Sequence, residues 1–542
     1  MVRRGPVGLA LALVAIAVVL TWAELAIAAL TVCLNETPDL ASGLRAQFPA
    51  SDATARWLLA FLTPLGVSAG PTPVCDVAAP ARAMAVAGLA YVAGICILDL
   101  GNVPRLLSWP VVIGVAIVAR VALLFVPGLL SSDIIDYATH GRVASLHAAN
   151  PYVLTPSQFP SDPFANLGAW PTTVTVYGPL WTRVDTVLTG ILANASLAEI
   201  TFAYKLLATA ADVVSACLIV WIVMRWGRLG VTRVAPVVAA AMWLWNPLVN
   251  VELIGNAHNE AVMLTLVLLA FALLTLALTG TARHWLWPAA LLSLWLGALI
   301  KFVPLAIGAV VALVWLRRGA ARGVRSVAAL IVIMIIVSLI VAAPWLDSPA
   351  IAAPVVGLAN GGQRFKDVWQ DAPAAWLTVR VVPLLGVPDD PATLRMDVAR
   401  LIVWSVTRAL FLAYLIGEGW LLWRSARGPV DATLRSIATG SMRLLLLALL
   451  LYTSQVYAWY FLWPLPMACL LGPRNVWSRA VVVFGLTFLP AFYLREFAPY
   501  GVFEMPRYAE LALAVLAATW LGARVVTARG QSRLRVMAAG PT

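Results

Sequence analysis

The sequence predicts an all-α, polytopic integral membrane protein with about fourteen membrane-spanning helices. Hydrophobic residues make up 62% of the 542 residues and charged residues only 11%, whereas about a quarter of the residues of a soluble domain are charged. The mean hydropathy is +0.90. Apolar runs recur along the whole chain, each near the ~20 residues that cross a ~30 Å hydrocarbon core. A large soluble helical protein is the alternative, and this composition argues strongly against it.

The predicted spans follow these apolar runs in chain order. They are Val7–Leu30, Ala83–Leu98, Trp109–Val126, Phe202–Met224, Val234–Val251, Ala261–Thr279, Trp285–Ile300, Val303–Trp315, Val327–Pro344, Leu401–Leu422, Ile437–Ser454, Trp459–Leu471, Val481–Leu494 and Tyr508–Leu521. The first is interpreted as a retained helix and not as a signal peptide, because Leu30–Asn35 lacks a clear small-x-small cleavage site.

The arginines predict the orientation. They lie in alternate short loops and in the two tails: Arg105; Arg225, Arg228 and Arg233; Arg317, Arg318, Arg322 and Arg325; Arg424, Arg427 and Arg435; Arg474 and Arg479; Arg3 and Arg4; Arg524, Arg529, Arg533 and Arg535. With an even number of spans, all of these fall on one side, which the positive-inside rule makes the cytoplasm. Both termini are then cytoplasmic. The net charge of +12 indicates contact with anionic lipid headgroups and not nucleic-acid binding.

Three long segments then lie outside the membrane: Thr31–Arg82, Ser131–Thr201 and Trp345–Arg400. We treat the chain as a single transmembrane domain, residues 1–542, with residues 131–200 and 345–400 as its main extracytoplasmic loops. Cys33 and Cys75 are a possible disulfide in the first segment, since such a compartment is oxidising. No Cys/His cluster has metal-ligand spacing, and no nucleotide-binding glycine motif is present.

A short helix that begins near Ser131 is the first candidate for chemistry. Ser131 or Ser132 can cap it, which puts Asp133 in the first turn. The helix N-terminus there favours an ionised carboxylate. Helical spacing places Asp133 and Tyr137 on one face, with Asp136 and His140 on the neighbouring one. We expect an amphipathic helix at the outer membrane surface.

Further polar and aromatic residues lie at outer span ends. Ionisable groups near hydrocarbon cost about 2.5–3.5 kcal/mol on insertion scales, so they are functional candidates. A lone His or Lys there is also commonly an interfacial anchor, and aromatic residues commonly form a membrane belt. The candidates are Glu252, Asn256, His258, Asn259 and Glu260, then Lys301, then Tyr457, Trp459 and Tyr460.

Together these motifs resemble the GT-C glycosyltransferases that use polyprenyl-phosphate sugars. The likeness is greatest to the actinobacterial polyprenol-phosphomannose-dependent α-1,6-mannosyltransferases. The residues that carry it are Asp133 with Tyr137, Gly141-Arg142, Asn150-Pro151-Tyr152, Tyr177-Gly178-Pro179-Leu180-Trp181, Asn246-Pro247, His258-Asn259-Glu260, Lys301 with Pro304, and Trp459-Tyr460 with Trp463 and Pro466. The chain departs from that family's pattern at Ser132, at Glu260 and at Tyr457-Ala458, where related sequences often have an acid, an Asp and His-Pro.

The resemblance implies an inverting glycosyltransferase that moves a sugar, mannose in the first instance, from a polyprenyl-phosphate donor to a lipid-linked glycan acceptor on the outer face of the plasma membrane. Asp133 would be the catalytic base. One base is enough, because a polyprenyl phosphate leaves without a strong general acid, unlike the leaving group in glycosidases, which use two carboxylates.

The remaining candidates form two groups: those for the leaving phosphate and those for other contacts with the substrates. The leaving phosphate needs cations or hydrogen-bond donors, and the candidates are His258, Lys301, Arg142, Arg364 and Lys366. Candidates for contacts with the substrates are Asp136, Tyr137, Tyr152, Tyr177, Asn259, Glu260, Tyr457, Trp459 and Tyr460. We expect no cofactor and no metal. The partners are membrane lipids and the two lipid-linked substrates.

Two alternatives stay open. One is a transporter or flippase for a lipid-linked glycan, which typically has internal repeats and polar groups at the middle of the membrane. No repeat stands out. Ionisable residues do fall within predicted spans, where they can pair or lie near span ends: Glu24, Arg120, Asp212, Arg408, Glu418 and Arg443. The other is the same fold with a different sugar, such as arabinofuranose.

Overall fold

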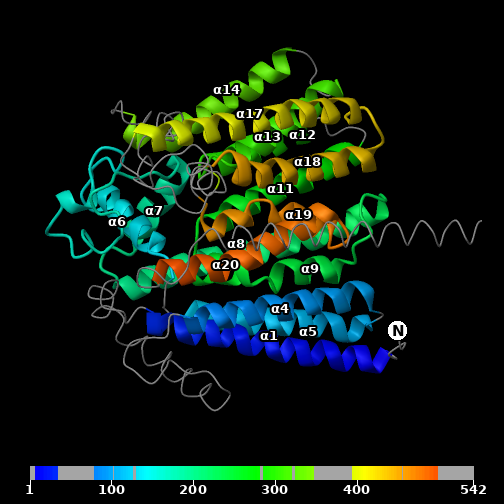
Figure 1. Ribbon diagram of the computed structural model, residues 1–542. Helices are drawn as coiled ribbons and strands as arrows, with labels where there is room; N and C mark the ends of the chain where they lie inside the picture. The colour runs from blue at the N-terminus through cyan, green and yellow to red at the C-terminus, as the bar shows by residue number, and fades with distance from the viewer. Residues whose placement is uncertain are drawn as a thin grey trace, which may run out of the picture.

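The computed structural model describes residues 6–34, 78–101, 103–125, 130–280, 285–319, 324–346, 394–453 and 456–497, together with residue 377. All regular structure within these ranges is helical. The helices run roughly side by side along one direction, and a smaller lobe covers one end (Figure 1). This arrangement confirms the predicted all-α class.

Nine helices in the described part of the chain are long and apolar enough to cross a membrane. They are α1 (Pro6–Leu34), α4 (Ala78–Leu100), α5 (Arg105–Phe125), α8 (Leu197–Arg228), α11 (Glu260–Thr279), α14 (Val324–Ala342), α17 (Leu394–Ser425), α18 (Val430–Leu451) and α20 (Val476–Phe497). A tenth span is bent by 46°. The protein is therefore a polytopic membrane protein.

Shorter apolar helices occupy three more of the predicted spans. They are α12 (Leu286–Ala298), α13 (Pro304–Arg317) and Ala458–Leu471, which combines η7 (Ala458–Leu462) with α19 (Leu465–Leu471). With 13 and 14 residues, α12 and α13 reach about 20 Å at ~1.5 Å per residue. The span predicted at Tyr508–Leu521 lies outside the described residues, so the total of about fourteen stays a prediction.

The bent span breaks where Pro247 follows Asn246. Helix α9 (Pro236–Leu244) ends there, and α10 (Pro247–Val249) leads directly into the π-helical η4 (Asn250–Gly255). The Asn246 side chain caps the new start by accepting the Leu248 N–H at 3.0 Å. Arg120 on α5 donates to the Leu244 carbonyl at 3.0 Å. Non-helical backbone at membrane depth needs such partners from neighbouring protein groups.

Ionisable groups inside the spans pair with one another. Arg120 contacts Asp212 on α8 at 2.7 Å, and Asn250 on η4 donates to Glu24 on α1 at 2.9 Å. These contacts tie α1, α5 and α8 to the break in the bent span.

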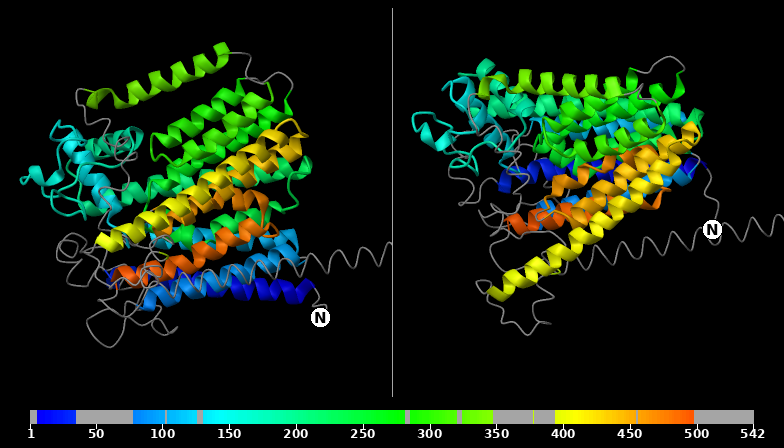
Figure 2. Two further views of the ribbon diagram at one scale, coloured as in Figure 1. Left: turned by 45° about the horizontal axis from the view of Figure 1, so that its top comes forward. Right: turned by 90° about the horizontal axis from the view of Figure 1, so that it is seen from above.

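The loops that carry arginines gather at the end opposite the lobe. Arg318, after α13, donates to the carbonyls of Ala426 and Gly428, between α17 and α18. Arg435 on α18 donates to the Gly230 carbonyl, after α8. Helix α1 begins at this same end, as both views of Figure 2 show. The charge asymmetry predicted from the sequence therefore exists in the fold.

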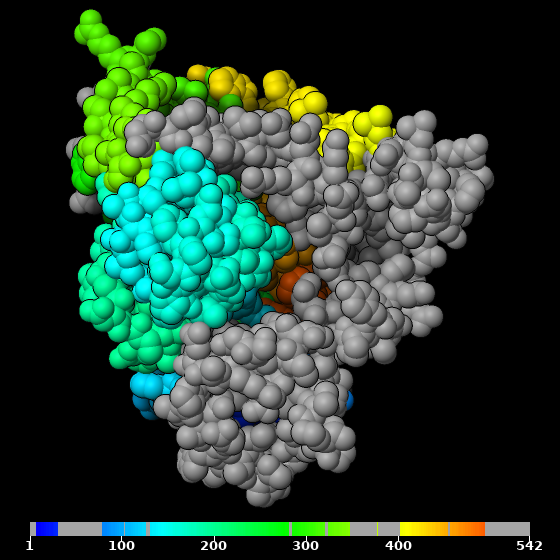
Figure 3. Space-filling view, turned by 90° about the vertical axis from the view of Figure 1, so that its left-hand side faces the viewer, coloured from blue at the N-terminus to red at the C-terminus, as the bar shows by residue number. Residues whose placement is uncertain are grey.

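The lobe is formed by α6 (Asp133–Ser145), η3 (Pro156–Gln158) and α7 (Pro179–Ile191), with the loops that join them. Figure 3 shows it end-on in cyan, with the orange surface of the later helices set back behind its edge. The prediction of an amphipathic surface helix was wrong in its exposure: every residue from Ile134 to Val143 is buried. The lobe encloses α6, and Gly141 allows this, since a Cβ there would come within 2.7 Å of the Asp185 carbonyl oxygen on α7.

Candidate active site

Asp133 is the first residue of α6, as predicted. The Ser131 hydroxyl accepts its N–H at 3.3 Å, so Ser131 supplies the cap. Ser132 instead donates to Asp136 at 3.1 Å. The Asp133 side chain keeps 16% of its exposure, so the lobe does not enclose it completely.

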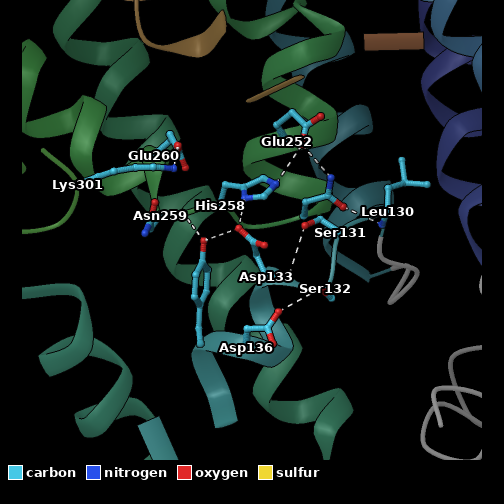
Figure 4. Close-up of polar contacts among 12 residues, drawn as sticks. Leu130, Ser131, Ser132, Asp133, Asp136, Glu252, His258, Asn259, Glu260 and Lys301 are labelled. Atoms are coloured by element: carbon cyan, nitrogen blue, oxygen red, sulfur yellow. Dashed lines mark hydrogen bonds and ion pairs between the residues drawn. The ribbon is translucent and has the colours of Figure 1, made fainter. Parts of the chain in front are cut away.

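His258 lies between two carboxylates. Its Nδ1 is 3.2 Å from Oδ2 of Asp133, and its Nε2 is 3.2 Å from Oε2 of Glu252 on η4 (Figure 4). Both are ion-pair contacts and not linear hydrogen bonds. The side chains of His258 and Glu252 are fully buried. This Asp133–His258–Glu252 row occupies both ring nitrogens of His258.

The electrostatics of the row favour an ionised Asp133. Burial acts to raise the pKa of Asp133, but contact with His258 and the positive charges of His258 and Lys301 outweigh it, so the pKa lies below its ordinary value. Burial likewise acts to lower the pKa of His258, and its contacts with Asp133 and Glu252 outweigh it and raise the pKa to about 9. At neutral pH His258 is therefore a cation beside the ionised Asp133.

Lys301 places a second cation near Asp133. Its Nζ is 2.5 Å from Oε1 of Glu260, which starts α11, and it lies over the rings of Tyr460 and Trp463, 5.0 and 5.7 Å from their centroids. The Trp463 indole N–H donates to the same carboxylate oxygen at 3.3 Å. The Lys301 side chain retains 15% of its exposure.

Two residues that follow His258 directly, Asn259 and Glu260, carry polar atoms without a described protein partner. Both side-chain polar atoms of Asn259 and Oε2 of Glu260 are buried and make no hydrogen bond to any described residue. Buried polar atoms are almost always hydrogen-bonded in proteins. A ligand rich in hydroxyl groups would satisfy an amide and a carboxylate in this position.

Aromatic rings frame the site. The Tyr137 hydroxyl donates to Asp133 and accepts the Asn259 N–H, each at 3.4 Å. Trp459 stacks on the His258 ring with centroids 4.1 Å apart, and Tyr457 stacks on Trp459 at 4.5 Å. The aromatic residues predicted from the sequence therefore come together around the row.

Comparison with known proteins points to a family. Residues 74–317 match the family model described as alpha-(1->6)-mannopyranosyltransferase, N-terminal domain. Over these residues, which make up somewhat less than half of the chain, it resembles the alpha-(1->6)-mannopyranosyltransferase family. It is a distant relative of alpha-(1->6)-mannopyranosyltransferase A of Mycobacterium tuberculosis (strain ATCC 25618 / H37Rv), with 26% identity over 438 residues, which is 77% of this chain and 75% of that protein. No solved structure matches the chain.

The family match and the mycobacterial relative together indicate a glycosyltransferase of the mannosyltransferase type. The matched region contains Asp133, Glu252, His258 and Lys301, so both cations and the row fall within the part of the chain that the family model covers.

Two residues predicted from the sequence, Tyr152 and Gly178, make structural contacts outside the Asp133–His258–Glu252 row. Tyr152 donates its hydroxyl to the Tyr177 carbonyl at 3.0 Å. Gly178 lies so close to the turn before Lys301 that a Cβ would come within 2.2 Å of the Leu299 carbonyl oxygen. These contacts bring Tyr177, whose ring lies 4.8 Å from that of Tyr137, to the site.

The structure does not bring Arg142 to the row. Its Nε contacts both carboxylate oxygens of Asp162 at 3.0 Å, and its guanidinium lies over the Phe164 ring at 4.4 Å. These contacts fasten the lobe, and they direct the guanidinium away from Asp133.

Asp136 also faces away from the row. It accepts the Trp170 N–H at 3.1 Å and the Ser132 hydroxyl. Burial first, and then the charge of Asp133, raises its pKa to about 7. Its neighbour on that face, His140, contacts the Asp136 and Thr173 carbonyls. The predicted difference between the two faces of α6 is confirmed.

Four further predictions lie outside the described residues. Arg364, Lys366 and Cys75 are not described, and Cys33 lies in the last turn of α1 with its side chain undescribed. Their roles stay predictions. Glu252 was a candidate from the sequence, but its contact with His258 was not predicted.

Proposed function

We propose that this chain transfers a mannosyl residue from a polyprenyl-phosphate donor to a hydroxyl of a lipid-linked glycan acceptor, with inversion at the anomeric carbon. The observation that carries the proposal is the ionised Asp133, which feels the charges of His258 and Lys301, together with the unpartnered atoms of Asn259 and Glu260 next to His258. The names of the family and of the mycobacterial relative support mannose as the sugar.

The proposed reaction needs one base and one cation. Asp133 takes the proton of the acceptor hydroxyl as that oxygen attacks the anomeric carbon. The bond from that carbon to the phosphate oxygen breaks, and its electron pair leaves with the polyprenyl phosphate. Lys301 stabilises the charge that develops on the phosphate. Attack opposite the leaving group turns a β-linked donor into an α-mannoside.

Asn259 and Glu260 are assigned to the sugar hydroxyls, and Tyr457, Trp459 and Tyr460 to the face of the sugar or the lipid beside it. His258 was a candidate for the phosphate. Both of its ring nitrogens face carboxylates, so we assign it instead to Asp133.

We place the site on the extracytoplasmic side and both termini in the cytoplasm. The support is the gathering of arginines at the end opposite the lobe (Figure 1), combined with the positive-inside rule. In a variant with Cys33 and Cys75 replaced by Ser, Ser161→Cys should react with an impermeant thiol reagent from outside, and Pro104→Cys should not. Both positions are exposed in the fold. The opposite labelling would reverse the orientation.

Transfer itself is tested with purified protein, radiolabelled polyprenyl-phosphate mannose and a panel of lipid-linked acceptors. A labelled product that an α-mannosidase removes supports the proposal. The same assay with polyprenyl-phosphate arabinofuranose tests the alternative sugar. In proteoliposomes, movement of a labelled lipid-linked glycan without any new glycosidic bond would support the transporter alternative and overturn the proposal.

A further inference from the structure

We propose that Glu252 is a positioning residue that holds His258 as a cation against the catalytic carboxylate of Asp133. This inference rests on the proposed function, because it assigns Asp133 as the base. Glu252 touches no substrate. It acts through His258, and it comes from a different element than either of its partners in the row.

The contacts of Glu252 leave it no freedom to turn away. It is fully buried, and the Tyr493 hydroxyl on α20 contacts its two oxygens at 2.9 and 3.0 Å. The Asn256 side-chain amide donates to Oε2 at 3.0 Å. The Nε2 of His258 lies 3.2 Å from that same oxygen. The carboxylate therefore presents a fixed oxygen to the imidazole.

The backbone reinforces this arrangement. The His258 N–H donates to the Glu252 carbonyl at 3.1 Å, so the two residues contact each other through both backbone and side chain. Ala257 between them has φ of 47°, a left-handed conformation that is uncommon for a residue with a Cβ. Strained backbone of this kind persists where the surrounding structure determines it, and it clusters at functional sites.

Charge explains why two carboxylates are needed. Burial of an imidazole disfavours its charged form, and an anion within ~4–6 Å favours it. Around His258 the facing groups are Asp133 from α6, Glu252 from η4 and the Trp459 ring from η7. An opposite charge at this distance also favours the ionised form of a carboxylate, so a cationic His258 holds Asp133 in its charged form more firmly than a neutral one.

The groups around Asp133 and Glu252 are the remaining influences on this balance. Tyr137, Tyr177 and Lys301 act directly on Asp133. The charge of Asp133 acts in turn on Asp136, and the charge of Glu260 acts on Tyr137 and Tyr177. Glu252 is faced by the Tyr493 hydroxyl and the Asn256 amide. Among these groups Glu252 is the anion that contacts His258 on the side away from Asp133.

The test uses Glu252→Gln in the full-length purified protein. The chain has four histidines, so ¹⁵N-histidine NMR with a His258→Gln reference spectrum assigns the titration of His258. We expect its midpoint to fall by ~1–3 pH units when one contacting anion is removed. The transfer rate constant kcat should fall by about 10-fold at pH 8 and by less at pH 6, where His258 regains its proton, while the donor KM changes less than about twofold.

Two more variants guard the interpretation. Tyr493→Phe keeps the Glu252 carboxylate and removes one hydrogen bond to it, so the midpoint of the His258 titration should fall by a smaller amount. This variant tests the inference if Glu252→Gln does not fold. Asp185→Asn is the matched control. Asp185 is also fully buried and accepts from the Tyr204 hydroxyl at 2.8 Å, away from His258, so the midpoint should not move.

A His258 midpoint unchanged in both Glu252→Gln and Tyr493→Phe overturns the inference, as does a kcat loss equal at pH 6 and pH 8. Failure of the proposed function looks different: the wild-type protein would transfer no sugar, while the NMR titration would still report on Glu252 and His258.

Discussion

Replacing Asp133 with Asn removes the base and preserves most of its surroundings. Asn has nearly the same size. Its carbonyl oxygen can still accept from the Tyr137 hydroxyl, now 3.4 Å from Asp133, and can still face the His258 ring. Glu252 remains on the far side of that ring. The substitution therefore isolates the carboxylate charge.

The expected loss is large. A positioned general base typically contributes 10²–10⁴-fold, which corresponds to about 2.7–5.4 kcal/mol of transition-state stabilisation at 1.36 kcal/mol per factor of ten. The effect on folding should be much smaller, because a charge in the first turn of a helix contributes about 0.3–1 kcal/mol. Asp133→Asn should thus be a stable protein that binds the donor and hardly turns it over.

Asp136→Asn is the matched control. Asp136 lies one helical turn away, and its partners are Ser132 and Trp170 instead of His258. Asn can keep the contact with the Trp170 N–H, and a pKa raised to about 7 means that the native group is already partly neutral. We expect less than about a tenfold loss, far below the loss of a base.

The assay measures sugar transfer by both variants at matched yield, with donor binding determined separately. An active Asp133→Asn beside an inactive Asp136→Asn would move the base to Asp136. Two active variants would remove the base from the mechanism altogether and would reopen the question of transport.

Three further predictions follow from the geometry. Lys301→Ala should lower kcat by ~10²-fold, as expected when one donor to a developing charge is lost, and Lys301→Arg should retain part of the rate. An unchanged rate in Lys301→Ala would point to residues 363–366 as the binding site of the leaving phosphate. Asn259→Ala should lower kcat/KM by about tenfold, the worth of one net hydrogen bond, without lowering thermal stability, because its amide has no described protein partner; a lower Tm would contradict a ligand-binding role. Gly178→Ala should cost ~1–3 kcal/mol of stability, because its Cβ would press on the Leu299 carbonyl, and an unchanged Tm on thermal unfolding would show that the turn can give way.

The sequence predicted well those features that depend on composition and local pattern. The apolar runs identified ten described spans, and the serines before Asp133 marked the start of α6. The motif order brought Asp133, His258 and Lys301 to one side, although 168 positions separate the first from the last. Burial was harder, since α6 has no continuous apolar face and is nevertheless enclosed by the lobe.

Pairing partners could not be predicted in the same way. Arg142 and Lys301 are both cations at outer positions, and nothing in the sequence indicates that Asp162 engages the first while Glu260 engages the second. The pairing of Glu252 with His258 was missed for a geometric reason. Six residues along a regular helix rotate the side chain by about 240°, which places Glu252 and His258 on different faces.

The irregular backbone of the bent span resolves that difference. The break at Asn246–Pro247 and the π-helical η4 end the regular helix before His258, and the left-handed Ala257 folds the imidazole back over Glu252. Such a break is costly in hydrocarbon unless protein groups satisfy the freed backbone, and Arg120 does so at the Leu244 carbonyl.

Buried charges in spans are commonly a sign of a transport path. In this fold Arg120 and Asp212 have another use: they support the irregular segment that carries the Glu252 carboxylate. Ionisable groups within the bundle thus serve the geometry of a site at its end, and a polar span interior is compatible with a glycosyltransferase as well as with a transporter.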